Sequence, residues 1–378
     1  MKFTKIALAA AFTLAALGSA HAELTIGVVQ PLTGPASGLG IPVKNGIMIW
    51  PKTIAGETVK LVVLDDATDP TTGVKDAQRL VTEDKVDVVV GSSATPVAIP
   101  MADVTAEAGT PQLATSPAGL PPGKDKWFFR LPQSNDVMAF AMVKHMKAQG
   151  VKTVGFLGYT DAYGELWLKA LTAEGEKNGI KIVGTERFAR ADTSVTGQVL
   201  KLTSANPDAI LIVASGSGAG MPQKAVMERG YKGKVYQTHA AATQDLMRTA
   251  GKDAEGTFVV SGPATVAEQL PDSHPSKKMA VAFVTNYEKA YGPGSRNQFA
   301  GHSADVLTVL EKAVPLALKK AKPGTPEFRS ALRDAFETMG RTVISHGVLE
   351  WTPQNHWGYT NETGVMLKVV NGAFKVEQ

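Results

Sequence analysis

Short apolar runs alternate with helical segments along the first two thirds of the chain. Runs rich in Val, Ile and Leu, bounded by turn-forming residues, are typical of strands buried on both faces of a parallel sheet. Such runs occupy residues 24–29, 59–64, 86–90, 153–157 and 209–214. Segments with apolar residues at helical spacing separate them. We therefore predict two successive series of strands and helices, which form two doubly wound, Rossmann-like α/β lobes.

The last third of the chain has a different pattern. Residues 276–291, 302–319 and 326–339 are predicted helices, with no strand of comparable quality between them. Helices without strands cannot build a third α/β domain, so we expect them to cover the sheet of the first lobe. A terminal hairpin is predicted over residues 365–376, with its turn at Asn371-Gly372.

The first 22 residues are predicted to be a cleaved signal peptide. Lys2 and Lys5 precede an apolar stretch that is too short for a membrane anchor, and Ala20-His21-Ala22 forms an A-x-A cleavage site. The sequence contains no cysteine, which excludes lipid attachment to a cysteine, disulfides and thiolate metal ligands. We expect a freely diffusing periplasmic protein that is not a lipoprotein.

The composition fits an ordinary globular protein of 378 residues, of which 44% are hydrophobic and 20% charged. This length is sufficient for two domains. Of the 39 basic residues, two lie in the predicted signal peptide, and 37 bases against 35 acids leave a net charge of +2. This small, scattered charge argues against binding to nucleic acid or to a membrane surface.

The stretch from Val86 to Gly119 is the strongest candidate for a binding site. A strand ends in Gly91-Ser92-Ser93-Ala94, and Thr95-Pro96 predicts a helix start with a capping hydroxyl. A second strand ends in Ser116-Pro117-Ala118-Gly119. Two neighbouring strand ends thus present hydroxyls and backbone N–H groups at a helix N-terminus, an arrangement that suits a carboxylate. The same residue types are also common in turns that bind nothing.

Motifs for catalysis and for cofactors are absent from the sequence, which lacks a nucleophile elbow, an H-E-x-x-H motif and a phosphate-binding loop. Residues 216–220 have G-x-G-x-G spacing, which does not match a dinucleotide fingerprint. The acids of residues 65–69 lack the spacing of a calcium loop, and Asp69 is predicted to cap a helix over 71–84. We predict no enzymatic activity and no cofactor.

The spacing of three histidines does not indicate a metal site. His239, His302 and His346 have no metal-like spacing to one another, and each is expected to be a surface or hydrogen-bonded histidine. We therefore predict no metal site. His239 follows a predicted strand, so it remains a candidate for contact with a ligand.

Several segments resemble the periplasmic solute-binding proteins of the leucine/isoleucine/valine-binding family, which are the type I receptors of ABC importers. The opening strand runs into P-L-T-G-P, and the later motifs are D-D-A-T-D-P, G-S-S-A-T-P, Tyr163-Gly164 and Gly230-Tyr231-Lys232-Gly233. The resemblance covers Glu23 to Gln378. It implies a non-enzymatic receptor whose two lobes close around a ligand and which delivers that ligand to an inner-membrane permease as a monomer.

The resemblance also implies where the lobes begin and end. Three crossovers join the lobes in this family, and here they are expected near residues 130–134, 261–263 and 346–353. Lobe one and lobe two are each made of two stretches of the chain, and the expected boundaries are 23–132 plus 263–347 for lobe one and 133–262 plus 348–378 for lobe two.

Ligand-binding residues are carried over from the family position by position. On lobe one the expected contacts are Leu39, Ser92, Ser93, Thr95, Ser116, Pro117, Ala118 and Gly119. On lobe two they are Tyr163, Ser217, Gly218, His239, Ala240 and Ala241.

The sequence departs from the family at the residues that would bind an α-amino group. The corresponding loops, Ser215–Gly220 and His239–Ala242, contain neither the acid nor the aromatic residue of the family. A buried ammonium without a carboxylate partner is costly, so we favour a carboxylate without an α-amino group, such as an aromatic acid. Glu165 or Glu268 reaching into the site would instead indicate an amino acid receptor. A ligand sensor that partners a membrane kinase is a further alternative.

Overall fold

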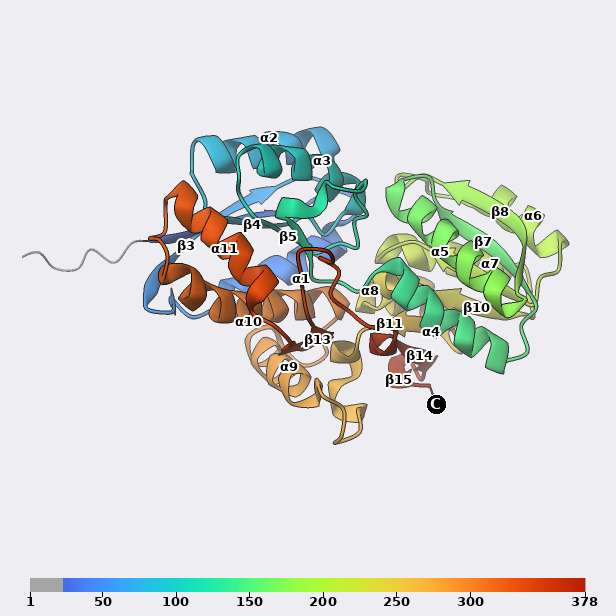
Figure 1. Cartoon of the computed structure of the whole chain (residues 1–378). Helices are drawn as coiled ribbons and strands as arrows, with labels where there is room; N and C mark the ends of the chain where they lie inside the picture. The colour runs from blue at the N-terminus through green and yellow to red at the C-terminus, as the bar shows by residue number, and fades with distance from the viewer. Residues whose placement is uncertain (1–22, 378) are drawn as a thin grey trace, which may run out of the picture.

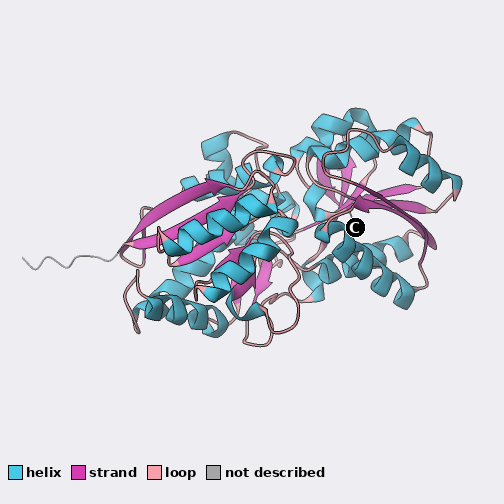
Figure 2. Cartoon of the chain, turned by 90° about the horizontal axis from the view of Figure 1, so that it is seen from above, coloured by secondary structure: helices cyan, strands magenta, loops and turns pink. Residues whose placement is uncertain are grey.

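The computed structural model describes residues 23–377, and the predicted signal peptide lies outside this range. Two α/β lobes lie side by side (Figure 1). Each has a central, mostly parallel sheet with helices on both faces, as the view from above shows (Figure 2). The predicted fold, two doubly wound lobes with three crossovers between them, is therefore confirmed. No helix among residues 23–377 is long and apolar enough to span a membrane.

The first sheet has the strand order β2-β3-β1-β4-β5-β6, and only β2 runs antiparallel to its neighbour. Its central strands consist of apolar, largely β-branched runs, and in β4 every residue is buried. The strands are β1 (Leu24–Gln30), β2 (Thr53–Ile54), β3 (Glu57–Asp65), β4 (Val88–Gly91), β5 (Gln112–Ala114) and β6 (Phe128–Arg130).

Helices from both ends of the chain cover this sheet. Trp50, just after α1, donates its indole N–H to the carbonyl oxygen of Ser303 in α10 at 3.2 Å, which ties the C-terminal helices to lobe one. The helices are α1 (Ser37–Met48), α2 (Pro70–Thr82), α3 (Thr95–Glu107), α9 (Lys277–Tyr291), α10 (Gln298–Leu318) and α11 (Pro326–Thr338), with the 3-10 helices η1 (Asp125–Trp127) and η4 (Pro263–Gln269).

The second sheet has the strand order β15-β14-β11-β10-β9-β7-β8. The chain returns to this sheet at its end, where β14 pairs antiparallel with β11 and turns into β15 through Asn371 and Gly372, both with positive φ. The strands are β7 (Thr153–Tyr159), β8 (Lys181–Phe188), β9 (Ala209–Val213), β10 (Lys234–Gln237), β11 (Phe258–Ser261), β14 (Val365–Val370) and β15 (Ala373–Val376).

The helices of the second lobe are α4 (Asn135–Ala148), α5 (Ala162–Asn178), α6 (Thr196–Ser204), α7 (Ser217–Glu228) and α8 (Gln244–Ala250), with the 3-10 helices η2 (His239–Ala241), η3 (Gly251–Ala254) and η5 (Asn361–Thr363). A separate two-stranded sheet pairs β12 (Thr342–Ile344) with β13 (Gly347–Leu349). Because the C-terminal hairpin joins the second sheet while α9 to α11 pack on lobe one, we propose the lobe boundaries expected from the sequence.

Of the two helix caps predicted from the sequence, the structure confirms one and corrects the other. The predicted cap of α2 is present, since Asp69 accepts a hydrogen bond from the backbone N–H of Thr72 at 2.7 Å. The predicted cap of α3 was wrong, because Ala94 is the capping residue and makes no side-chain cap, while Thr95 is the first helical residue. Its hydroxyl is therefore not engaged as a cap.

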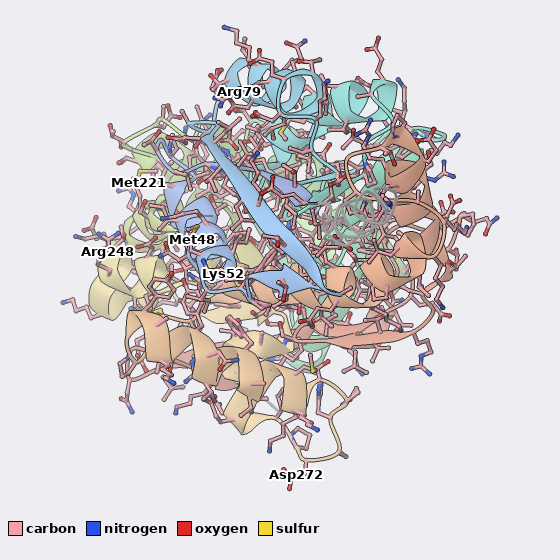
Figure 3. The ribbon with its side chains drawn as sticks, turned by 90° about the vertical axis from the view of Figure 1, so that its left-hand side faces the viewer. Met48, Lys52, Arg79, Met221, Arg248 and Asp272 are labelled. Atoms are coloured by element: carbon pink, nitrogen blue, oxygen red, sulfur yellow. The ribbon has the colours of Figure 1, made fainter. Side chains whose placement is uncertain are left out.

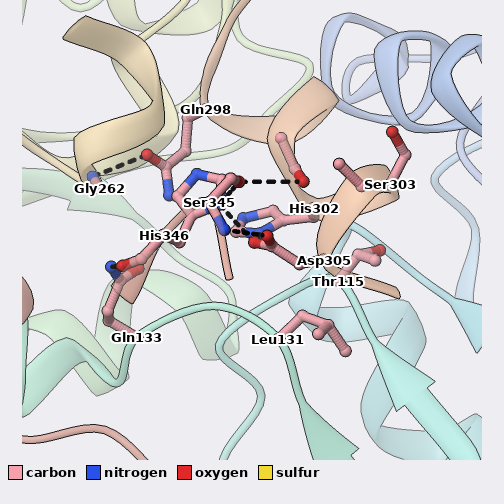
Figure 4. A network of polar contacts seen from close by, with 12 residues as sticks. Thr115, Leu131, Gln133, Gly262, Gln298, His302, Ser303, Asp305, Ser345 and His346 are labelled. Carbon is pink, nitrogen blue, oxygen red and sulfur yellow. Dashed lines mark hydrogen bonds and ion pairs between the residues drawn. The ribbon is translucent and has the colours of Figure 1, made fainter. Parts of the chain in front are cut away.

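The three crossovers meet at a group of buried side chains that we call the hinge cluster, made of Gln133, Gly262, Gln298, His302, Asp305 and His346 (Figure 4). Gln133 donates to the carbonyl oxygen of His346 at 2.8 Å, and the N–H of Gly262 donates to Gln298 Oε1 at 2.8 Å. His346 Nδ1 lies 2.6 Å from Asp305 Oδ2. One residue from each crossover is thus tied to the same cluster.

Exposed charged side chains of both signs project from the periphery of the molecule. Arg79, Arg248 and Asp272 are examples on the face drawn in Figure 3. Their side chains are 51%, 71% and 99% exposed, and each is paired with an opposite charge at the surface. Such pairs contribute little to stability, and they also leave no strong field of one sign on this face.

Candidate ligand-binding site

A small cavity of about 10 Å³, room for about one water molecule, lies between the two lobes. Its walls come from loops and helix starts at the carboxyl ends of the parallel strands, where open α/β sheets bind ligands. Lobe one contributes Leu39, Ser93, Thr95, Pro117 and Phe299, and lobe two contributes Tyr163, Arg190, Ser215, His239 and Ala240.

The structure therefore brings half of the fourteen expected contacts together around one cavity. The seven are Leu39, Ser93, Thr95, Pro117, Tyr163, His239 and Ala240. The other seven do not line it, and three lining residues were not predicted, namely Arg190, Ser215 and Phe299.

On lobe one, hydrogen bonds fix the loop after β4. Ser93 donates its hydroxyl to Gln30 Oε1 at 2.6 Å and lies 2.9 Å from the hydroxyl of Thr115. Gln30, at the end of β1, donates to the same Thr115 hydroxyl at 3.0 Å. These bonds join the ends of β1, β4 and β5, so the polar wall of lobe one is held in place without a ligand.

Ser92 and Ser116 lie behind this wall. Ser92 is fully buried, donates to Asp66 Oδ2 at 2.7 Å and accepts from the N–H of Ala94, so its hydroxyl serves the turn. Burial raises the pKa of Asp66 to about 6 in spite of these hydrogen bonds. Ser116 is also fully buried, and its hydroxyl has no partner among the described residues. It remains a potential donor beside Pro117.

Three further expected contacts, Ala118, Gly119 and Gly218, pack against other residues of the protein and do not line the cavity. The carbonyl oxygen of Ala118 accepts from Arg130 Nε at 2.7 Å. A Cβ at Gly119 would lie 3.3 Å from Leu166 Cδ2 of lobe two, so this glycine allows the lobes to approach closely. A Cβ at Gly218 would lie 2.3 Å from the hydroxyl oxygen of Tyr159.

Ser217 and Ala241 also lie outside the lining. The sequence placed the start of α7 at residue 221, whereas the helix begins at Ser217, so the expected loop residues Ser217 and Gly218 form its first turn. Ala241 ends the short helix η2 and is fully buried in the core of lobe two.

Tyr163 lies at the start of α5, where Asp161 accepts hydrogen bonds from the first turn. The ring is 3% exposed, and its hydroxyl donates to Thr238 Oγ1 at 2.8 Å. Burial raises the pKa of this tyrosine, so the hydroxyl stays protonated. With its proton committed to Thr238, Tyr163 offers a ligand the face of its ring and an oxygen lone pair.

Arg190 is the one cationic side chain that lines the cavity. It follows β8, and its side chain is 11% exposed. Nε donates to Asp161 Oδ2 at 2.6 Å, Nη1 donates to the Ser215 hydroxyl at 3.0 Å, and the guanidinium lies 4.1 Å from the ring centroid of Tyr159. These contacts fix the guanidinium plane while leaving further N–H groups free to bind an anion.

Two of the unpredicted residues carried a signal in the sequence. Arg190 lies two residues after β8, at a strand exit from which no contact was predicted. Phe299 is in the first turn of α10, which begins at Gln298 because Asn297 accepts from the N–H of Ala300 at 2.8 Å. Asparagine is a preferred capping residue, so this earlier helix start could have been predicted.

No acid lines the cavity. Glu165 and Glu268, the two acids that could have supplied an ammonium partner, are half exposed and paired with Arg187 and Arg296 respectively. Two acids lie behind the lining: Asp161, which is paired with Arg190, and Asp245, which is paired with Arg248 and lies beside Gly38 and Gly216. The charge of the cavity wall thus favours an anion over a cation.

His302, Asp305 and His346 form the one group of described residues whose potential metal-ligand atoms lie within 4.8 Å of one another. The two imidazole rings stack at 4.3 Å between centroids, a contact between distant positions that the sequence did not predict. Asp305 Oδ2 and His346 Nδ1 are directly hydrogen-bonded, with no room for an ion between them. Burial alone would raise the pKa of Asp305, but His346 and these hydrogen bonds lower it to about 2.

The buried histidines predict a pH-dependent stability. Burial, with nearby imidazoles adding to it, lowers the pKa of His239 to about 3 and that of His302 to about 4. Because these values lie below the ordinary 6.5, the unfolded chain takes up protons first as the pH falls. Stability from neutral His239 is thus complete above about pH 6.5 and decreases toward pH 3, by about 1.4 kcal/mol per pH unit.

We expect His239→Phe to remove the contribution of His239 to the pH dependence of the unfolding free energy. The difference in unfolding free energy between wild type and variant should shift by about 2 kcal/mol in favour of the variant between pH 7 and pH 5. Urea denaturation at both pH values, followed by circular dichroism, measures it. A difference that stays constant between the two pH values would mean that His239 titrates normally in the folded protein.

Comparisons with known proteins agree with this architecture. The periplasmic binding protein family matches residues 23–360. The Leu/Ile/Val-binding protein homolog 3 of Brucella melitensis is 31% identical over 261 residues, which cover 66% of this chain and 70% of that relative. The structure of an extracellular ligand-binding receptor from Rhodopseudomonas palustris is 48% identical, with a TM-score of 0.92 over 94% of this chain and 99% of that one.

A more distant structure has the same fold. It is a solute-binding protein of an ABC transporter from R. palustris in complex with benzoate, 18% identical, with a TM-score of 0.78 over 94% of this chain and 95% of that one. The matched region includes every residue that lines the cavity and ends before β14 and β15 of lobe two. This chain therefore belongs to the periplasmic binding protein family, as a receptor of the Leu/Ile/Val-binding type.

Proposed function

We propose that this protein is the substrate-binding component of an ABC importer and that it binds a small organic acid without an α-amino group between its lobes. The observation that supports this most is the charge of the cavity lining, which contains the guanidinium of Arg190 and no carboxylate. Hydroxyls of Ser93, Thr95 and Ser215 line the same space. Because the Ser93 hydroxyl donates its proton to Gln30, the donors left for a carboxylate are Arg190 and the hydroxyls of Thr95 and Ser215, whose hydrogen bonds to it would be charge-assisted.

An α-amino group would be poorly accommodated in this cavity. A buried ammonium needs a carboxylate or several acceptors, because an unpaired buried charge is very unfavourable. The guanidinium of Arg190 would also repel it at short range. The amino acid specificity suggested by the names of the relatives is therefore the alternative, and the organic acid is the ligand we favour.

The apolar part of the lining supports an aromatic acid in particular. Phe299 and Tyr163 offer ring surfaces, and Leu39 and Pro117 add aliphatic contacts, all within the same cavity. Aromatic groups packed in this way gain both buried area and favourable ring geometry. The R. palustris protein in complex with benzoate is an example of this fold with a bound aromatic acid. At 18% sequence identity, its similarity to this chain is one of fold alone.

Binding requires no covalent chemistry in this proposal. The two serine hydroxyls in the lining contact Gln30 and Arg190, not a general base, which does not favour a nucleophile. The ligand would bridge the two lobes and shift the population toward the closed form. The closed, monomeric protein would then dock on an inner-membrane permease from the periplasm. A sensor kinase is the alternative partner.

A thermal-shift screen with matched ligands tests this function. Each pair differs only in the amino group, namely phenylalanine with 3-phenylpropanoate and leucine with 4-methylpentanoate, and benzoates and dicarboxylates complete the panel. The protein is first unfolded and refolded to remove any bound ligand. At 100 times its Kd, a ligand stabilises the folded state by about 2.7 kcal/mol. We expect stabilisation by acids that lack the amino group, whereas stabilisation by the amino acids alone would overturn the proposal.

A further inference from the structure

His239 is a buried imidazole that lines the cavity without a partner. The residue is 1% exposed, and neither nitrogen of its ring has a hydrogen-bond partner among residues 23–377. The ring lies 6.0 Å from that of Tyr163 and 5.9 Å from that of Trp167, measured between centroids. It shares the cavity wall with Arg190, Ser215 and Phe299.

The fold itself does not account for the free nitrogens of His239. Buried polar atoms are nearly always hydrogen-bonded, and three other largely buried histidines of this chain have a partner for at least one ring nitrogen. His346 contacts Asp305, His356 contacts Glu337, and His145 contacts Tyr236. His302 has none among the described residues, but it lies outside the cavity lining, with its Nδ1 3.9 Å from the carboxylate of Asp305. Tyr163, the polar neighbour of His239, donates its hydroxyl to Thr238 instead. The cavity is therefore the side from which a partner for His239 can come.

The protonation state of His239 restricts what that partner can be. Burial, together with the nearby His302 and His346, lowers its pKa to about 3, so the imidazole is neutral at physiological pH. A neutral imidazole carries one N–H donor and one acceptor nitrogen. It supplies no charge for a carboxylate, whereas Arg190 on the same wall does. A hydroxyl or carbonyl group of a ligand matches it better.

We propose that His239 determines specificity by hydrogen-bonding an uncharged hydroxyl or carbonyl group of the ligand. This inference rests on the proposed function and narrows it to carboxylic acids that carry a second, neutral polar group. Arg190 and the hydroxyls around it bind the carboxylate, and Phe299 and Tyr163 contact the body of the ligand. An acid without the second group enters the cavity but leaves His239 unpaired.

Matched acids test this proposal by isothermal titration calorimetry. Benzoate is compared with its 2-, 3- and 4-hydroxy derivatives, and 3-phenylpropanoate with its ring-hydroxylated forms, so that the position of the hydroxyl is not assumed. We expect the best hydroxylated member of a series to bind about tenfold more tightly than the parent acid, the effect of one well-placed hydrogen bond. In His239→Phe this preference should disappear, so that the hydroxylated acids bind no more tightly than the parent acid.

Two further variants keep the test decisive. His145→Phe replaces a histidine of the same lobe that contacts Tyr236 outside the cavity, so the preference for the hydroxyl should persist. His239→Gln retains one donor and one acceptor and should keep part of the preference even if the phenylalanine variant folds poorly. A hydroxyl preference that survives in a folded His239→Phe protein overturns the inference.

The same titrations separate this inference from the proposed function. If wild type binds parent and hydroxylated acids equally well, His239 does not determine specificity, but the protein remains an organic acid receptor. If no carboxylic acid in either series binds while amino acids do, the proposed function itself is wrong.

Discussion

Replacing Arg190 by glutamine should weaken the binding of a carboxylate ligand by roughly 30- to 150-fold, that is, by about 2 to 3 kcal/mol. Arg190 supplies the positive charge of the cavity, and its guanidinium is fixed by Asp161, Ser215 and the ring of Tyr159. A hydrogen bond to a charged group is worth about twice a neutral one in such a partly dry site. Titration calorimetry with the best acid from the panel measures the loss.

The neighbouring arginine provides a matched control. Arg187 also belongs to the β8 region and pairs with an acid near the start of α5, Glu165, but this pair is 39% and 50% exposed and lies outside the cavity. Arg187→Gln should therefore leave the affinity within about twofold, because exposed ion pairs contribute little. Arg190→Lys keeps the charge but not the planar fork, so an intermediate affinity is expected.

Loss of affinity in Arg190→Gln must not be mistaken for loss of fold. Asp161 keeps the backbone N–H of Tyr163 as a partner at 2.9 Å, but its pair with Arg190 is only 11% and 20% exposed, so removing the arginine can cost up to about 3 to 5 kcal/mol. Urea denaturation of the variant must therefore show that it is folded under the conditions of the titration. If the folded variant binds the acid as tightly as wild type does, Arg190 is not the anchor for the carboxylate, and the donors of lobe one are sufficient.

Gly262→Ala should lower the free energy of unfolding by about 1 to 3 kcal/mol, the usual range for overpacking. Gly262 lies on the second crossover, and a Cβ there would lie 2.2 Å from His346 Cδ2 and 3.2 Å from both Gln133 and Gln298. The backbone at Gly262, with φ −77° and ψ 159°, is open to alanine, so the effect is steric.

The ring of His346 has little room to move away from the added methyl group. On its other side, a Cβ at Gly301 would lie 2.3 Å from His346 Cε1, so the ring fills the space between two glycines. Asp305 holds its Nδ1 at 2.6 Å. Because the three crossovers share this cluster, Gly262→Ala should also alter the ligand-induced compaction measured by small-angle X-ray scattering.

Gly197→Ala is the control for this substitution. Gly197 lies in the first turn of α6, and a Cβ there meets nothing within 4 Å. Alanine should be neutral at this position or stabilise the protein by up to about 1 kcal/mol. Equal unfolding free energies for Gly262→Ala and wild type would show that His346 can leave its place, and the hinge cluster would then be looser than its packing indicates.

The sequence was sufficient to predict the lobe-one wall of the cavity because the relevant signals are local. Ser93, Thr95 and Pro117 follow strands whose apolar runs are easily recognised, and side chains at the carboxyl ends of neighbouring parallel strands must meet. Tyr163, by contrast, was expected from the resemblance to the family. The lack of an acid in the lobe-two loops is likewise visible in the sequence, and it already favoured a ligand without an ammonium group.

The sequence could not separate residues that face the cavity from those one position away. Ser92 and Ser93 are adjacent and chemically alike, yet Ser92 points to Asp66 while Ser93 lines the cavity, because the turn after β4 sends them in different directions. Ser217 and Gly218 do not line the cavity because they form the first turn of α7, which begins at residue 217 and not at residue 221 as its apolar pattern indicates.

By itself, the sequence determined the α/β class and the two strand–helix series, because strand periodicity and turn chemistry are encoded over short distances. Only the tertiary structure shows that Arg190, paired with Asp161, lies in the part of the cavity wall that lobe two forms. The tertiary structure also brings the rings of His302 and His346 to 4.3 Å between centroids in the hinge cluster, although the two residues lie 44 positions apart in the sequence. Such contacts depend on how crossovers bring distant segments together, and no local pattern records that arrangement.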